Sequence, residues 1–335
     1  MMYGAVDRFL VTLDSPGALQ YLHHTLSVPH TPRERIVRAV RRARLRRMQT
    51  AEAISPLPEL MSESLWPQRP STGTIYLRDV ANSDRGRVLA FLFTNGEAQP
   101  YAIVKAQTAR GAALSSLAAE AEALDRLGTQ LPSSIEIPRV LELHRSSRGE
   151  LLVTTAVPGR SAYVDLRRSL VPRMNVTAHF DAAARWLASF HEAAGDVSHG
   201  DFWPGNVLMT ANGAVAVIDW EHFSASASPF IDVFHYPLTY GLRYPWKRYT
   251  RLEPEDAFRR AFLERNHLSR AVTRYLRTYA ERRKIGRADL TKAFRDFLAA
   301  PHPPFGMENL PWQRFAALAD SAPRGLTFAS SADWR

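Results

Sequence analysis

The feature that most constrains this chain is a loop followed by a hairpin near its middle, beginning with HGDFWPGN at residues 199–206. A Pro-Gly pair forces a turn between Asp201 and Asn206. Residues 207–218 then read as two short apolar runs separated by an Asn-Gly turn, and this pattern predicts a β-hairpin. The hairpin is expected to return Asp219 to the side of Asn206.

These three side chains carry oxygen atoms with a defined chemistry. A carboxylate and an amide oxygen are hard ligands that suit Mg²⁺ on nucleotide phosphates, because Mg²⁺ keeps several waters and takes few protein ligands. We therefore assign Asn206 and Asp219 to the metal and leave Asp201 to take the proton of a substrate hydroxyl. The alternative is that Asp201 caps a turn and Asp219 ends a strand in an ordinary α/β domain. The spacing favours a phosphoryl-transfer site.

The segment resembles the catalytic loop and metal-binding Asp of the aminoglycoside phosphotransferase and choline kinase family, the small-molecule relatives of protein kinases. That family shows His-Gly-Asp, an Asn five residues on and an Ile-Asp-Trp-Glu-like strand end, and this chain has the same pattern. The resemblance covers residues 74–240. It implies an α+β, bilobal, protein-kinase-like fold, with a small antiparallel β lobe that carries one helix and a larger, mainly helical lobe. It also implies that His199 orients the loop and that Asp232 braces it.

A kinase needs a strand Lys to hold the α and β phosphates of ATP and a helix Glu to hold that Lys. Residues 101–106 form an apolar run with Lys105 near its end, and an Asn-Gly turn connects this run to another at 88–93. Lys105 is the predicted phosphate ligand. The alternative for a lone Lys at a strand end is a solvated side chain.

A helix predicted at about 111–127 offers Glu120 and Glu122 as partners for Lys105. Glu120 falls within the apolar stripe of this helix, whereas Glu122 points to nearly the opposite side. A carboxylate on a core-facing stripe needs a counter-ion, because burying it unpaired is costly. We therefore predict a Lys105–Glu120 pair, with a surface position for Glu120 as the alternative.

Two further nucleotide contacts follow from the resemblance. An apolar strand at 151–157 that ends at a Pro-Gly pair resembles the hinge between the lobes, which places Ala156 and Val157 at the adenine. These contacts are mostly made by the backbone, so GTP remains an alternative to ATP. The loop over the nucleotide corresponds to residues 81–86, where Gly86 is the only glycine.

The acceptor class is narrowed by what the sequence lacks. Gly200 stands where protein kinases usually have Arg, and only about a dozen residues separate Asp219 from Asp232, which leaves little room for a peptide-docking segment. A small molecule or a glycan hydroxyl is therefore the expected acceptor. Residues 222–335 hold nineteen Lys or Arg against eleven Asp or Glu, a bias that favours a neutral or anionic acceptor over a polycationic drug.

Length and composition limit the number of domains, the kinds of metal site and the cellular location that can be expected. A chain of 335 residues can hold two lobes, and the absence of cysteine excludes disulfides and thiolate metal sites. We divide it into an N-terminal extension at 1–70, a nucleotide-binding small lobe at 71–157 and a catalytic, substrate-binding helical lobe at 158–335. No 18-residue apolar run and no secretory signal are found, so a cytoplasmic enzyme is expected.

The N-terminal extension carries much of the net charge of +10. Between Arg33 and Arg47 there are eight Arg and one Glu, in a segment predicted to be helical. The segment is either a solvated helix or a contact for an anionic surface. It lacks aromatic residues for stacking on bases, so nucleic acid is not an expected partner. The alternative function for the whole chain is a pseudokinase-type binding module that docks through this basic arm.

Overall fold

The structure is a computed structural model that forms two compact units, one built mainly of antiparallel strands and one mainly of helices. Unit 1 contains Met1–Thr129 and Ile137–Pro158, and unit 2 contains Gln130–Glu136 and Gly159–Arg335. The chain therefore combines helices with antiparallel sheet. The residues that the structure describes are 3–6, 9–12, 15–26, 73–78, 87–94, 96–108, 117–147, 149–168, 173–210, 213–245, 252–300, 306–322 and 325–330.

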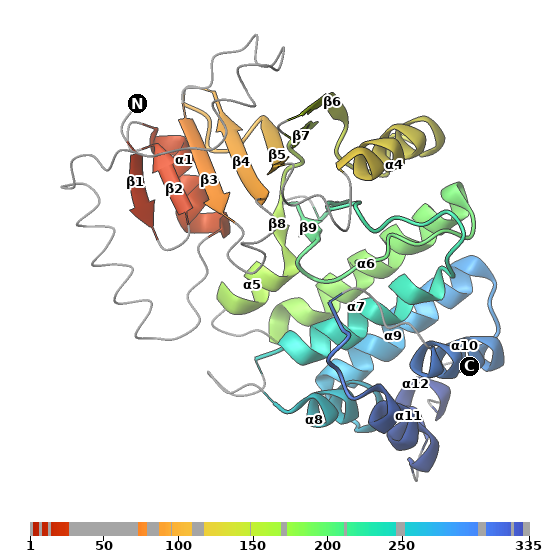
Figure 1. Ribbon diagram of the computed structural model, residues 1–335. Helices are drawn as coiled ribbons and strands as arrows, with labels where there is room; N and C mark the ends of the chain where they lie inside the picture. The colour runs from red at the N-terminus through yellow and green to blue at the C-terminus, as the bar shows by residue number, and fades with distance from the viewer. Residues whose placement is uncertain are drawn as a thin grey trace. The chain divides into compact units, whose positions relative to one another are not determined.

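Unit 1 is built on a seven-stranded sheet with the order β1-β2-β3-β4-β5-β7-β6, in which every neighbouring pair is antiparallel (Figure 1). The sequence analysis did not predict β1 and β2, which extend this sheet beyond β3. The strands and helical elements of the unit are β1 (Tyr3–Val6), β2 (Phe9–Thr12), α1 (Pro16–Tyr21), the π-helical turn η1 (Leu22–Leu26), β3 (Gly73–Arg78), β4 (Arg87–Phe93), β5 (Ala102–Thr108), α4 (Leu117–Gln130), β6 (Val140–Ser146) and β7 (Gly149–Thr155).

The two faces of the sheet are covered differently. Side chains alternate along a strand, so neighbouring residues of β4 point to opposite faces. Phe91 and Phe93 pack in one cluster with Tyr21 at the end of α1, whereas Ala90 and Leu92 belong to a second cluster with residues of β5 and β7. Alternation thus lets the single strand β4 contribute to two apolar layers.

The pairing of β5 with β7 determines where Lys105 points. Lys105 lies opposite Leu152, and residues directly opposite each other in an antiparallel pair share one face of the sheet. Leu152 packs against Leu117 and Ala121 of α4. Lys105 is therefore on the face that α4 covers, which brings it within reach of Glu120.

Unit 2 combines a three-stranded sheet, β10-β9-β8, with a set of helices (Figure 1). Among its described residues, no helix combines the length and the apolar composition that crossing a membrane requires, and the same holds for unit 1. The elements of the unit are β8 (Arg160–Ser161), α5 (Ala162–Arg168), α6 (Arg173–Ala194), β9 (Val207–Met209), β10 (Val215–Val217), α7 (Phe230–Arg243), α8 (Pro254–Phe258), the π-helical turn η4 (Arg259–Leu263), α9 (His267–Arg283), α10 (Arg287–Ala299), α11 (Trp312–Ser321) and α12 (Thr327–Ser330).

The core of unit 2 is unusually aromatic. Helices α6, α7 and α9 meet around rings such as Phe180, which lies 4.6 Å from Tyr240 and 5.6 Å from Tyr275 between centroids. Helix α6 is also joined to α9 by a hydrogen bond of 2.8 Å between His191 Nδ1 and the hydroxyl of Tyr279. His191 therefore packs and hydrogen-bonds, as its position after an apolar stripe predicts.

His235 of α7 makes the stability of this core depend on pH. The side chain is 1% exposed, and its Nδ1 atom has no hydrogen-bond partner within the described residues. Burial lowers the pKa of His235 to about 4, although Asp232 acts in the opposite direction. Below pH 6.5 the His235 side chain binds a proton in the unfolded chain but stays neutral in the folded chain. The free energy of unfolding therefore falls as the pH falls towards 4.

We expect this one group to remove about 3 kcal/mol of stability between pH 7 and pH 4. His235→Leu should abolish that part of the pH dependence, measured by urea unfolding at both pH values. Wild type, measured at both pH values, provides the reference for this variant. Equal pH profiles for wild type and His235→Leu would show that His235 is not the group responsible.

Candidate functional site

A buried carboxylate at the start of α7 holds the loop that precedes β9. Asp232 is 0% exposed and accepts hydrogen bonds from the backbone N–H of His199 at 2.6 Å and of Gly200 at 3.0 Å. It also accepts from the hydroxyl of Ser198 at 3.0 Å. Burial raises the pKa of Asp232, but the neighbouring His191 side chain, 3.6 Å away, and the hydrogen bond from the backbone N–H of His199 lower it below its ordinary value. The loop is thus held by an ionised group.

Gly200 is required by the path of this loop. Its φ is +81°, in the left-handed region that side chains other than glycine rarely adopt. A Cβ atom at this position would also collide with the backbone carbonyl of His222. Glycine at position 200 therefore allows the backbone of the loop to approach the backbone of His222 closely.

His199 orients the loop from inside, through both nitrogens of its ring. Its Nδ1 accepts from the backbone N–H of Asp201 at 3.2 Å, and its Nε2 donates to the carbonyl of Ile218 at 3.1 Å. One accepting and one donating nitrogen define a neutral imidazole. Complete burial lowers the pKa of His199, in agreement with the neutral form, and the ring packs edge-on against Trp220 at 4.5 Å.

Asp201 and Asn206 lie side by side within the loop. The amide of Asn206 donates to Oδ2 of Asp201 at 2.8 Å and to the carbonyl of Asp201 at 3.0 Å. Burial raises the pKa of Asp201 to about 8, helped by the negative charge of Asp219 and opposed by the hydrogen bond from Asn206. The ionised carboxylate of Asp201 therefore binds a proton more tightly than that of an exposed aspartate.

Asp219 follows β10 in a strained backbone conformation. Its φ is +71°, whereas most positive-φ positions in the described residues are glycine. Strain of this kind costs about 1–3 kcal/mol, and it occurs often at functional sites. The preceding residue, Ile218, donates its N–H to the carbonyl of Asn206 at 3.1 Å. The hairpin of β9 and β10 therefore brings Asp219 next to the loop that carries Asn206 and Asp201.

The donor atoms of this loop fit a hard cation with few protein ligands. Because both side-chain hydrogen bonds of Asn206 to Asp201 use its Nδ2, its Oδ1 atom can serve as a ligand. Asp219 adds a carboxylate, and together these oxygens suit Mg²⁺. Among the described residues there is no cluster of three or more His, Asp or Glu that could form a denser metal site.

Unit 1 contains a second charged pair, formed by Lys105 of β5 and Glu120 of α4. Lys105 Nζ lies 2.7 Å from both carboxylate oxygens of Glu120. The Glu120 side chain is 3% exposed and the Lys105 side chain 23%, so the ammonium group is the more accessible of the two. Glu122 is exposed, which leaves Glu120 as the partner selected by the helix.

Removing the ammonium group should destabilise unit 1, because the buried carboxylate of Glu120 then loses its counter-ion. Lys105→Met is expected to cost roughly 3 kcal/mol in the free energy of unfolding, and Lys105→Met combined with Glu120→Leu should recover most of this loss. Urea unfolding of the three proteins measures both effects. Glu122→Gln, at an exposed position, serves as the control and should change little. A double variant as unstable as Lys105→Met would contradict the expected coupling.

Ala156 and Val157, the residues predicted to contact adenine, lie directly after β7. The N–H of Ala156 donates to the carbonyl of Tyr101 at 3.1 Å, so this donor is already used within unit 1. Within the described residues no backbone hydrogen bond of Val157 is formed, which makes Val157 the better candidate for an adenine contact. Gly86 and the segment from Arg33 to Arg47 lie outside the described residues.

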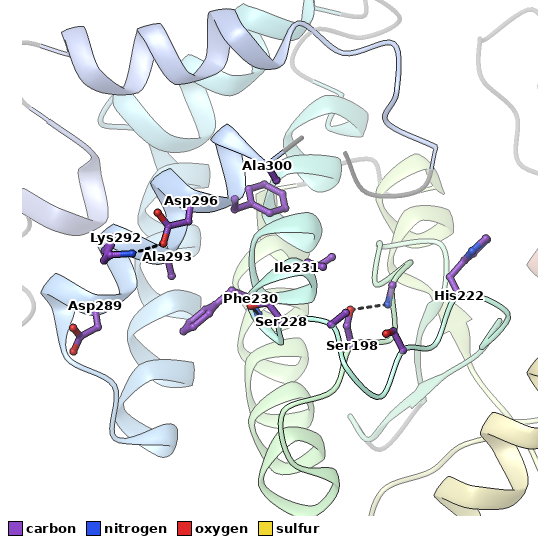
Figure 2. A pocket seen from close by; sticks show the side chains of 14 residues that line it. Ser198, His222, Ser228, Phe230, Ile231, Asp289, Lys292, Ala293, Asp296 and Ala300 are labelled. Carbon is purple, nitrogen blue, oxygen red and sulfur yellow. Dashed lines mark hydrogen bonds and ion pairs between the residues drawn. The ribbon is translucent and has the colours of Figure 1, made fainter. Parts of the chain in front are cut away.

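A cavity of about 550 Å³ lies in unit 2 between the loop and helix α10 (Figure 2). It reaches the loop at Ser198 and Gly200, and its far wall includes Asp289 and Asp296, the latter paired with Lys292 at 2.7 Å. Its lining does not include Asp201, Asn206 or Asp219 among the described residues. The cavity thus borders the back of the loop rather than its carboxylate.

The roles of two residues of this site, Ser198 and Trp203, were not predicted from the sequence. Ser198 shares the carboxylate of Asp232 with the loop and also accepts from Gly200 N–H at 3.0 Å, but a serine before the motif has no distinguishing pattern. Trp203 packs its indole over Gly205, where a Cβ atom would collide with the ring. A Trp followed two residues later by Gly could have indicated this contact.

Comparisons with known proteins give partial structural similarities. No family model and no curated protein matches the sequence. A crystal structure of WbdD is 18% identical with a TM-score of 0.33, and the match covers 45% of this chain and 33% of that one. A structure of the bifunctional kinase-methyltransferase WbdD is 16% identical with a TM-score of 0.34, covering 60% and 43% of the two chains. This chain thus spans less than half the length of either WbdD structure.

The aminoglycoside phosphotransferase APH(3'')-Id from Streptomyces rimosus, in complex with ADP and streptomycin, is also similar. It is 17% identical with a TM-score of 0.35, and the match covers 57% of this chain and 94% of that one. All three TM-scores are below 0.5.

Proposed function

We propose that the protein is an ATP- and Mg²⁺-dependent phosphotransferase that transfers the γ-phosphate to a hydroxyl group of a small molecule or glycan. The observation that carries this proposal is the arrangement around Asp201. A basic carboxylate, an amide with an available oxygen and a strained second carboxylate come together on one loop and hairpin. This is the side-chain set that positions a nucleophile and holds the metal in phosphoryl transfer.

Each proposed site residue of unit 2 has a separate role in the reaction. Asp201 orients the acceptor hydroxyl and takes its proton as the oxygen attacks the γ-phosphate. Asn206 and Asp219 would hold Mg²⁺, which when bound neutralises charge on the phosphates. Asp232 and His199 do not contact substrate in this scheme; they fix the backbone on which Asp201 stands.

Lys105 of unit 1 is assigned to the α and β phosphates of ATP. Glu120 holds its ammonium group through two oxygens at 2.7 Å, and the Lys105 side chain is 23% exposed, so an anionic ligand can reach it. Val157, with Ala156 beside it, is the proposed adenine contact, and GTP is the alternative nucleotide. Gly86 is the proposed contact of the covering loop.

Thermal unfolding with nucleotide tests this function without knowledge of the acceptor. ATP with Mg²⁺ should raise the unfolding temperature more than ATP alone, because a ligand at 100 times its Kd stabilises the folded state by about 2.7 kcal/mol. GTP titrated in parallel decides between the two nucleotides. Absence of any Mg²⁺-dependent shift with either nucleotide would contradict the proposal.

A further inference from the structure

An aromatic pair lies beside the proposed catalytic carboxylate. Trp203, two residues after Asp201 on the same loop, packs its indole over Gly205. Tyr163 at the start of α5 lies 5.7 Å from Trp203 between ring centroids, and its backbone N–H donates to the carbonyl of Pro204 at 3.0 Å. Both rings are therefore fixed to the loop that carries Asp201.

An arginine side chain packs against each ring of the pair. The guanidinium carbon of Arg167 lies 5.5 Å from the ring centroid of Tyr163, and that of Arg243 lies 5.9 Å from the ring of Trp203. These are the separations of cation–π contacts, which orient a guanidinium without neutralising its charge. The two guanidinium groups, one from α5 and one from the end of α7, thus lie next to the loop.

The nearby carboxylate does not neutralise these arginines. Asp165, on α5 between Tyr163 and Arg167, is paired with Arg160 at 3.1 Å and contacts His179 at 3.4 Å. Within the described residues neither Arg167 nor Arg243 forms an ion pair, and the Nε atom of Arg167 is buried without a hydrogen-bond partner. Arg160, Arg277 and Arg283 also have a buried Nε without a hydrogen-bond partner, but each of them forms an ion pair with a carboxylate. Of these four arginines, Arg167 alone lacks a carboxylate partner within the described residues, and an anionic ligand would neutralise its charge.

We propose that Arg167 and Arg243 form a clamp that binds an anionic group, a phosphate or a carboxylate, on the hydroxyl-bearing acceptor. The proposal rests on the phosphotransferase function assigned to Asp201. A guanidinium presents a planar fork of donors that matches the oxygens of both groups. The clamp would hold the charged end of the acceptor while its hydroxyl reaches Asp201. It therefore selects against cationic acceptors.

Four sugars that share one ring test the clamp by charge: glucose, glucose 6-phosphate, glucuronate and glucosamine. Calorimetric titration in the presence of ADP and Mg²⁺ should give a Kd at least about tenfold lower for the two anionic sugars than for glucose, with glucosamine the weakest. Added salt should weaken only the anionic sugars. Tighter binding of glucose 6-phosphate indicates a clamp for phosphate, and tighter binding of glucuronate indicates a clamp for carboxylate. Either result supports the proposal.

The variant Arg167→Gln/Arg243→Gln should bring the anionic sugars to the affinity of glucose while leaving ATP binding with Mg²⁺ unchanged. Arg270→Gln, which removes an exposed arginine of α9, is the matched control and should keep the preference. Ala293→Phe, which narrows the cavity beside α10, should also keep it. Loss of sugar binding in Ala293→Phe but not in the arginine variant would place the acceptor in the cavity and overturn the clamp.

The remaining outcomes separate this inference from the proposed function. If ATP binds with Mg²⁺ but both anionic sugars fail to bind, or bind no tighter than glucose, the clamp is wrong and the phosphotransferase proposal stands. If neither ATP nor GTP binds with Mg²⁺, the phosphotransferase proposal fails, whatever the sugars do. If the arginine variant weakens ATP binding, the two arginines contact the nucleotide instead, and the clamp is again wrong.

Discussion

Asp201→Ala is expected to lower turnover by roughly 10²- to 10⁴-fold while ATP still binds with Mg²⁺. The variant removes the base that takes the proton of the acceptor hydroxyl. It does not remove the support of the loop, because Asn206 keeps its hydrogen bond to the backbone carbonyl of Asp201 at 3.0 Å. Basal hydrolysis of ATP, in which water replaces the acceptor hydroxyl, provides a rate that can be measured before the acceptor is known.

The control for this variant is another aspartate of unit 2. Asp196 has a side chain that is 80% exposed and pairs with Arg283 at 3.5 Å, so Asp196→Ala removes a carboxylate at the surface. It should hydrolyse ATP at the wild-type rate. An Asp201→Ala protein that is as active as Asp196→Ala would show that Asp201 is not the base.

Asp219→Asn is expected to weaken ATP binding by on the order of 10²-fold or more when Mg²⁺ is present, because the metal loses its charged protein ligand. Asn is the preferred substitution at this position. The φ of Asp219 is +71°, and Asn tolerates this region better than Ala, whose backbone strain would add to the loss of the ligand. Calorimetric titration of ATP with and without Mg²⁺ measures the effect.

The titration without Mg²⁺ serves as the control for Asp219→Asn. Wild type and variant should bind metal-free ATP with similar affinity, since the substitution removes only the metal contact. Equal affinity for ATP with Mg²⁺ in the two proteins would show that Asp219 is not a ligand. A parallel loss with and without the metal would instead indicate that the substitution disturbs the loop, and the ligand assignment would again lack support.

The parts of the fold that could be predicted from the sequence depend on local patterns. Two short apolar runs joined by an Asn-Gly turn predict the hairpin of β9 and β10, and its pairing in the structure follows that pattern. The apolar stripe of α4 similarly separates the buried Glu120 from the exposed Glu122. In both cases the deciding information lies within about fifteen residues of chain, where spacing fixes which side chains share a face.

Other features depend on partners that are distant in the chain. Strands β1 and β2 are runs of four residues, too short for a periodic signal, and they become strands because β3 pairs with β2 from more than sixty residues away. The contact of Arg243 with Trp203 likewise joins the end of α7 to the loop across forty residues. The left-handed backbone of Asp219 is imposed by its surroundings, since its sequence neighbours would allow an ordinary strand end.

The hydrogen bonds of Asp232 have a consequence for protein engineering. This carboxylate holds Ser198, His199 and Gly200 from more than thirty residues further along the chain. The conformation of the loop therefore depends on a residue that is not part of the loop. A grafted peptide of residues 198–219 would carry every proposed catalytic and metal-binding side chain of unit 2 without the group that gives them their geometry. A transplant of this site to another scaffold must therefore include the first turn of α7.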